Sequence, residues 1–322
     1  HISVSQLPNT YNGNQDFYIQ STVYLNEPVP NENVKLFYQI NEEDIIDSVM
    51  MSHLVDNVYE ISLIEMGMMP GNTLTYWVKV ILTNGDSLFS QQKQFSVIEP
   101  QNPDANILLV DDGIAINAAE PIKTYLENYA QEVEVFNIAD NHGWDASITT
   151  YTGTSETIYD VMIIMGFGTT TVPTREYLGN PVAAYLDAGG NLLFVDQDYF
   201  FTNDEVEIPL FDAGDFAYDY FGISGGVNDP EEDAILAGYG LEFLSGIELD
   251  LDYSVFGNSN WPDFLFENQA LPILYSADPS ETYSDSTLGV YYEGENFQTI
   301  LISAPVLAAN EGTAEDVILS DP

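Results

Sequence analysis

Residues 107–113 read ILLVDDG, and this stretch decides how the second half of the chain is interpreted. Four apolar residues lead directly into two aspartates and a glycine, which is the pattern of a buried strand that ends in polar residues. Carboxylates at such a strand end can bind a metal ion, accept a phosphoryl group or form a turn. The choice depends on what the other strands of the same half supply.

Strand and helix patterns alternate after this stretch, as they do in a parallel sheet whose strands are connected by helices. We therefore predict an α/β doubly wound parallel sheet over residues 107–322, with an irregular acidic insertion at about 203–286. The runs that suggest strands are 107–110, 133–138, 161–165, 191–196, 289–293 and 299–305, and helical spacing is present at 116–131 and 173–190.

The first 99 residues have a different pattern, because their strand-like runs alternate and are rich in Tyr, Val, Ile and Thr. Asn84-Gly85 between two of these runs is a strong hairpin signal. We predict an all-β sandwich of immunoglobulin or fibronectin type III shape over 1–99. Tyr76 and Trp77 lie in mid-strand and are predicted to be core residues. Residues 100–106, which contain two prolines, are predicted to be a linker.

Charge excludes several classes of partner. The chain has 52 acidic residues against 5 basic ones, for a formal net charge of −47. Such a surface repels nucleic acid and anionic membranes, so we expect neither as a partner. Self-repulsion of the folded chain has to be screened by salt or divalent cations, which favours a saline or calcium-rich exterior. No apolar run reaches the length of a membrane span.

The sequence does not support catalysis by a nucleophilic side chain or transfer of a phosphoryl group. There is no cysteine, which excludes disulfides, thiol catalysis and cysteine-type zinc sites, and there are three histidines. ILLVDDG also resembles the opening of a response-regulator receiver domain, which implies a phosphoryl-accepting aspartate at the end of the third strand, but Met165 and Gly166 stand there. No lysine or arginine follows Arg175 to neutralise a phosphoryl group.

Several segments occur in a familiar order: ILLVDDG, YDVMIIMGFG, VAAYLDAGGNLLFVDQDY, FAYDYFGI and GVYYEGENFQTILISAPVLAA. This order resembles the glutamine-amidotransferase-like (flavodoxin-like) domains of large secreted proteins from Bacteroidetes-type bacteria, in which a fibronectin-like sandwich often comes first. The resemblance implies a class I glutamine-amidotransferase-like fold in a secreted or cell-surface protein. Catalytic members place a cysteine in the turn after the strand that follows the paired glycines. Gln197 and Asp198 stand there instead, so the resemblance implies a domain without its nucleophile.

Four carboxylates are the candidate metal ligands. Asp111 and Asp112 follow the first strand of the second half, and Asp196 and Asp198 follow the fourth. Because ligands of doubly wound sheets bind at the carboxyl ends of the strands, these groups can converge on a hard cation such as calcium. The alternative is that Asp112 turns the chain and caps the next helix while Asp196 and Asp198 point apart.

Two weaker candidates lie in loops. Asp140, His142 and Asp145 form a polar cluster in the sequence after the second strand, and the alternative is an ordinary polar loop. Trp144 and Trp261 are candidates for stacking on a glycan, and the alternative is packing within the protein.

We therefore expect a non-catalytic extracellular or cell-surface module that is a structural, adhesive or assembly unit of a larger secreted protein, in one form a filament or layer. We expect no enzymatic activity, and calcium is the candidate cofactor. The expected partners are other copies, other surface-protein domains or a glycan. The alternative function is a metal-assisted hydrolase or glycan-binding module that uses the carboxylates at the sheet edge.

Overall fold

The computed structural model describes most of the chain. The described residues are 1–25, 29–41, 46–64, 66–111, 119–129, 131–149, 157–166, 181–197, 199–200, 208–228, 230, 237–251, 261–277 and 285–304.

Contacts within the chain divide it into two compact units. Unit 1 comprises residues 1–101 and 139–148, and unit 2 comprises residues 102–138 and 149–322. The segment 139–148 therefore leaves unit 2 after a strand, packs with unit 1 and returns. The sequence pattern predicts instead that this segment belongs with the second half of the chain.

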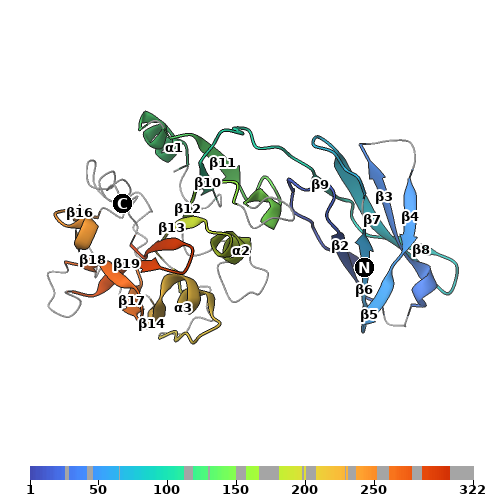
Figure 1. Cartoon of the computed structure of the whole chain (residues 1–322). Helices are drawn as coiled ribbons and strands as arrows, with labels where there is room; N and C mark the ends of the chain where they lie inside the picture. Colours follow the sequence, from blue (N-terminus) through green and yellow to red (C-terminus); the bar gives the residue numbers. More distant parts are fainter. Residues whose placement is uncertain are drawn as a thin grey trace. The chain divides into compact units, whose positions relative to one another are not determined.

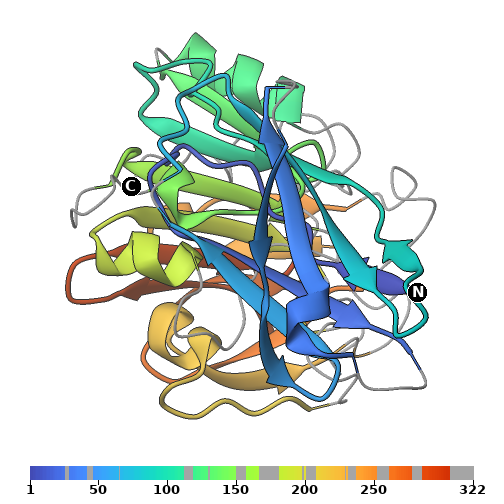
Figure 2. The same ribbon diagram turned by 90° about the vertical axis from the view of Figure 1, so that its right-hand side faces the viewer.

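Unit 1 consists of two antiparallel sheets (Figures 1 and 2). Their orders are β1-β2-β6-β5 and β4-β3-β7-β8, with β9 also pairing with β7. The strands are β1 (Ile2–Val4), β2 (Phe17–Val23), β3 (Val34–Ile40), β4 (Asp47–Met50), β5 (Ser52–Val55), β6 (Val58–Leu63), β7 (Thr73–Ile81), β8 (Ser87–Phe89) and β9 (Lys93–Ser96), and a 3₁₀ turn, η1, spans Asn31–Asn33.

Alternation along the strands builds the core of unit 1, because successive side chains of a strand point to opposite faces. Tyr76 and its alternate neighbours on β7 are fully buried, whereas Trp77 and Lys79 lie on the other face. The prediction that Tyr76 is a core residue is confirmed, and the same prediction for Trp77 is wrong. Burial raises the pKa of Tyr76 to about 12, and its hydroxyl donates to the carbonyl of Ser5 over 2.8 Å. The hairpin predicted at Asn84-Gly85 is present between β7 and β8.

Unit 2 is organised by one nine-stranded mixed sheet, in the order β11-β10-β12-β13-β20-β19-β18-β15-β16. A separate antiparallel pair is formed by β14 and β17. The described strands of unit 2 are β10 (Ile107–Asp111), β11 (Val133–Asn137), β12 (Val161–Gly166), β13 (Asn191–Asp196), β14 (Ile223–Val227), β15 (Ala237–Gly240), β16 (Glu248–Asp250), β17 (Phe264–Glu267), β18 (Leu271–Ser276), β19 (Thr287–Glu293) and β20 (Gln298–Ile302).

The prediction of a C-terminal doubly wound α/β domain is wrong. Of the described residues, 46% lie in strands and 13% in helices, and the large sheet is mixed. Pairing is parallel from β11 to β20 but antiparallel from β20 to β16. The segment 203–286, which the sequence pattern predicts to be an irregular insertion, supplies β15, β16 and β18. A short connection such as that between Glu293 and Gln298 can join only antiparallel strands, so no helix separates β19 from β20.

The described helices are short: α1 (Ala119–Asn128), α2 (Pro181–Asp187) and α3 (Phe216–Phe221), with 3₁₀ turns η2 (Ala146–Ile148) and η3 (Glu242–Leu244). Helix α1 packs Ala119, Ile122 and Leu126 onto the core that contains Leu109 and Ile163, as its spacing predicts. None of the helices in the described part of the chain has the length and hydrophobicity needed to cross a membrane.

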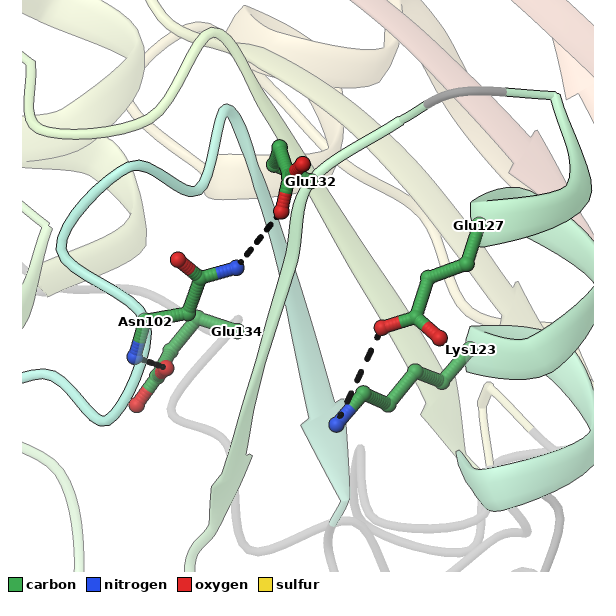
Figure 3. Close-up of polar contacts among 5 residues, drawn as sticks. All are labelled: Asn102, Lys123, Glu127, Glu132 and Glu134. Carbon is green, nitrogen blue, oxygen red and sulfur yellow. Dashed lines mark hydrogen bonds and ion pairs between the residues drawn. The ribbon is translucent and has the colours of Figure 1, made fainter.

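The first residue of unit 2 is fixed by two glutamates of the same unit (Figure 3). The backbone N–H of Asn102 donates to the buried carboxylate of Glu134 over 2.7 Å, and its side-chain amide donates to Glu132 over 3.1 Å. Figure 3 also shows the ion pair of α1, in which Lys123 and Glu127 lie 4.0 Å apart. These contacts order the chain at the point where residues 100–106 were predicted to be a linker.

Candidate functional site

Two of the four predicted metal ligands lie at strand ends, and the other two fall outside the described residues. Asp111 ends β10 and Asp196 ends β13, while Asp112 and Asp198 are not described. In the register of the sheet, Asp111 pairs with Met165 on β12, and Met165 pairs with Val195 on β13. Since paired residues of a parallel sheet share a face, Asp196 projects from the face opposite to Asp111.

The structure therefore does not bring Asp111 and Asp196 together on one face of the sheet. Asp111 accepts a hydrogen bond of 3.2 Å from the side-chain amide of Asn137 on the neighbouring strand β11, and Asp196 is buried. Within the described ranges, no three His, Cys, Asp or Glu side chains are grouped so that they could hold a metal ion.

Gln197, directly after β13, is the most unusual polar group at this edge of the sheet. Its side chain is 1% exposed, and neither its Nε2 nor its Oε1 has a hydrogen-bond partner among the described residues. A buried amide without partners is rare, because it gives up two donors and an acceptor to the protein interior without compensation. In the sequence, Gln197 is conspicuous only because it stands where catalytic members of the resembled family have a cysteine.

Asp263 is a buried carboxylate that the sequence pattern does not reveal. Its Oδ2 accepts the backbone N–H of Phe200 over 2.8 Å, and its carbonyl oxygen lies 2.5 Å from the Ser303 hydroxyl. Asp263 and Ser303 are both fully buried. Asp263 thus ties the residues after β13 to those after β20. In sequence it stands in WPDF, which has no strand alternation and no charge pattern that marks a site.

Of the loop residues Asp140, His142 and Asp145, Asp145 anchors the loop within unit 1. Asp145 accepts hydrogen bonds from Thr10 (3.0 Å), from the hydroxyl of Ser147 (2.5 Å) and, through its other oxygen, from Gln15 (3.0 Å). His142 has a positive φ of 60° and occupies a turn position. Both carboxylate oxygens of Asp145 are occupied by unit 1, which favours the polar-loop alternative over a catalytic one.

The two indoles considered for glycan stacking differ in exposure. Trp144 is buried within unit 1, and Trp261 in unit 2 is half-buried. Stacking on a sugar requires an open ring face, so the burial of Trp144 argues against that use of its side chain.

A surface that the sequence pattern does not identify lies on the outer side of the sheet β4-β3-β7-β8. Lys35, next to the buried Val34 and Leu36, faces outward, and the ladder places its neighbours on the same side. We call this surface the β3–β7 outer face. Its residues are Lys35, Phe37, Met50, Trp77, Lys79 and Phe89.

The rings of the β3–β7 outer face are arranged around a lysine. Phe37 and Trp77 stack with centroids 6.0 Å apart and an interplanar angle of 17°. The ammonium of Lys79 lies 6.0 Å from the Phe37 centroid and 5.6 Å from that of Phe89, within the range of cation–π attraction. Met50 and Phe89 are 58% and 59% exposed. Two of the five cations of this acidic chain therefore lie among exposed apolar groups.

No family model and no curated protein matches this chain. Several solved structures share weak likeness with it, and three of them are described here. A β-galactosidase from the Antarctic haloarchaeon Halorubrum lacusprofundi is 10% identical with a TM-score of 0.37, and the match covers 66% of this chain and 29% of that one. A cycloalternan-degrading enzyme from Trueperella pyogenes is 12% identical with a TM-score of 0.23, over 34% and 20%. The purple acid phosphatase PPD1 from yellow lupin (Lupinus luteus) is 11% identical with a TM-score of 0.22, over 60% and 35%. All three TM-scores lie below 0.5, and this chain spans less than two thirds of each of these proteins, so their activities are not transferred to it.

Proposed function

We propose that this chain is a non-catalytic module that acts outside the cell by binding other proteins, as a structural, adhesive or assembly unit of a larger secreted or cell-surface protein. The β3–β7 outer face is the observation that carries this proposal. Aromatic residues and methionine are enriched in protein–protein contacts, and Phe37, Trp77, Phe89 and Met50 are gathered on this face. On this chain they lie on a sheet that can present them as a rigid patch.

The composition of the chain supports the extracellular part of the proposal. A net charge of −47 favours a medium in which salt or divalent cations screen the folded chain. Calcium is the cation that we propose to act in this way, because carboxylate oxygens are its preferred ligands. The non-catalytic part rests on the sequence, which has no cysteine and offers Gln197 at the end of β13.

Surface labelling of the source organism tests this function. Antibodies against the chain are expected to label intact cells and to detect the chain in assemblies sedimented from them. Expression of the double variant Trp77→Ser, Lys79→Glu should release the protein from those assemblies into the medium. The matched control is Tyr18→Ser, an exposed aromatic residue on β2 of the other sheet. Labelling that requires permeabilised cells, or turnover of a substrate by the purified chain, would contradict the proposal.

A further inference from the structure

A second exposed patch, in unit 2, has the opposite charge to the β3–β7 outer face. We call residues 208–219 the 208–219 segment. Its Leu210 is 74% exposed and Ile208 is half exposed, and the carboxylates of Asp212 and Asp219 are exposed beside them. The segment contains both exposed aliphatic and acidic side chains, and it has no lysine or arginine.

Backbone hydrogen bonds hold the 208–219 segment in place. Phe211 donates to the carbonyl of Ser224 over 2.9 Å, and Gly226 donates to that of Pro209 over 3.1 Å, which fixes the segment along β14. Within the segment, Asp215 accepts the backbone N–H of Asp212, and Asp219 accepts that of Gly214. The exposed side chains are thus presented from an ordered backbone, which lowers the entropic cost of binding.

The two patches match in chemistry. The β3–β7 outer face offers Lys35 and Lys79 around apolar rings, and the 208–219 segment offers carboxylates around Leu210. An apolar centre with opposite charges on the two sides gives both affinity and a fixed orientation. Like charges elsewhere on two chains of net charge −47 repel, so a contact between copies is most favourable where one side carries lysines.

We infer that a second copy of this chain docks through its 208–219 segment onto the β3–β7 outer face of the first. This inference rests on the proposed function, since it names the partner of that face. The contact joins two different patches, so in a pair one copy keeps a free β3–β7 outer face and the other keeps a free 208–219 segment. Repetition of such a contact builds an open chain of molecules unless its rotation closes a ring.

Zero-length cross-linking of lysines to carboxylates tests the contact directly, because the chain has only four lysines. An equal mixture of ¹⁵N-labelled and unlabelled full-length chain is cross-linked at high salt and digested. We expect mixed-isotope peptides that join Lys79 or Lys35 to Asp212 or Asp219. Cross-links of Lys79 and Lys35 that join only peptides of one label, or that reach other carboxylates, would overturn the inference.

Complementation of two variants separates this contact from other modes of association. The face variant is Trp77→Ser, Lys79→Glu, and the segment variant is Leu210→Ser, Asp212→Asn. Each alone is expected to raise the dissociation constant of self-association, measured by analytical ultracentrifugation, by about tenfold or more. Their mixture should form pairs that go no further, because each variant keeps one intact patch.

The control for these substitutions is Tyr18→Ser, Lys123→Glu, which changes an exposed aromatic residue and a lysine that belong to neither patch. It should associate like the parent chain, and equal melting temperatures of all variants show that folding is retained. A parent chain that stays monomeric at every concentration overturns the inference. Association that neither variant weakens also overturns it, and in that case the proposed surface function stands with a different contact.

Discussion

At the scale of single residues, the Gln197 side chain lowers the stability of the fold and lies at the carboxyl end of the parallel strands. Leaving a buried polar group without partners costs about 1–3 kcal/mol of folding free energy. The Gln197 side chain has no partner among the described residues, and it follows β13 at the carboxyl end of the parallel strands. Buried groups that lower stability are often part of functional sites, because stability and function compete there.

Replacement of this amide by an apolar side chain of similar length should therefore stabilise the fold. We expect Gln197→Met to raise the free energy of unfolding by about 1 kcal/mol, since no hydrogen bond is lost and the desolvated amide is removed. Urea denaturation of the full chain measures the change. The control is Gln20→Met on the exposed side of β2, which should be near neutral. A loss of more than about 1 kcal/mol in Gln197→Met would show that the amide is hydrogen-bonded in the folded protein.

Sequence patterns locate strand ends at the residue scale but not the direction of their side chains. Asp111 and Asp196 end their strands as expected, because the apolar runs before them mark buried strands. Whether two such residues share a face depends on the register between strands, and a shift of one residue reverses the answer. The prediction that Trp77 is a core residue is wrong for a similar reason, because aromatic residues are common on both faces of a sandwich strand.

At the scale of elements, the loop 139–148 is held by a network that no local pattern reveals. Thr10 and Ser147 are buried, their hydroxyls lie 2.8 Å apart, and both contact Asp145. Asn9 adds two hydrogen bonds to Asn141. The residues involved are about 130 positions apart in sequence, so only the folded chain brings them together.

Removal of the carboxylate should release this loop. We expect Asp145→Ala to destabilise unit 1 by about 2–4 kcal/mol, because hydrogen bonds to a charged group contribute about 1.5–3 kcal/mol each and two of the donors, Thr10 and Ser147, remain buried. Hydrogen exchange followed by mass spectrometry should show faster exchange at Tyr11 and Asn12, whose N–H groups donate to Ser147 and Thr10. Asp140→Ala, in the same loop but exposed, serves as the control. Unchanged exchange in Asp145→Ala would mean that other contacts hold the loop.

The fold of the second half could be predicted only where strands are long and apolar. β10, β12 and β13 have continuous apolar runs, and β19 and β20 are recognisable by β-branched and aromatic residues. β15 and β16, which read AGYG and ELD, have three or four residues each and no run of hydrophobic positions. Because these strands extend the sheet in antiparallel order, missing them produces the wrong fold class.

At the scale of the whole molecule, charge opposes compactness. The chain carries 52 carboxylates, and the described residues contain a single ion pair, between Lys123 and Glu127. Unpaired carboxylates repel one another over a distance set by ionic strength, about 8 Å at 0.15 M and about 3 Å at 1 M. Stability should therefore depend on salt more than it does for a protein with balanced charge.

Thermal melts separate screening by salt from specific binding of calcium. We expect sodium chloride near 1 M to raise the melting temperature of the full chain by several degrees relative to low salt, because repulsion among carboxylates of the folded chain is reduced. Calcium chloride is compared with sodium and magnesium chloride at equal ionic strength. If calcium is the cofactor, it raises the melting temperature further than either, and chelation removes only this additional part. Asp111→Asn and Asp196→Asn are expected to leave the calcium effect unchanged, because the two carboxylates project from opposite faces of the sheet. A melting temperature that is independent of sodium chloride would contradict the destabilising effect of carboxylate repulsion, and loss of the calcium effect in both variants would restore a shared site for these two residues.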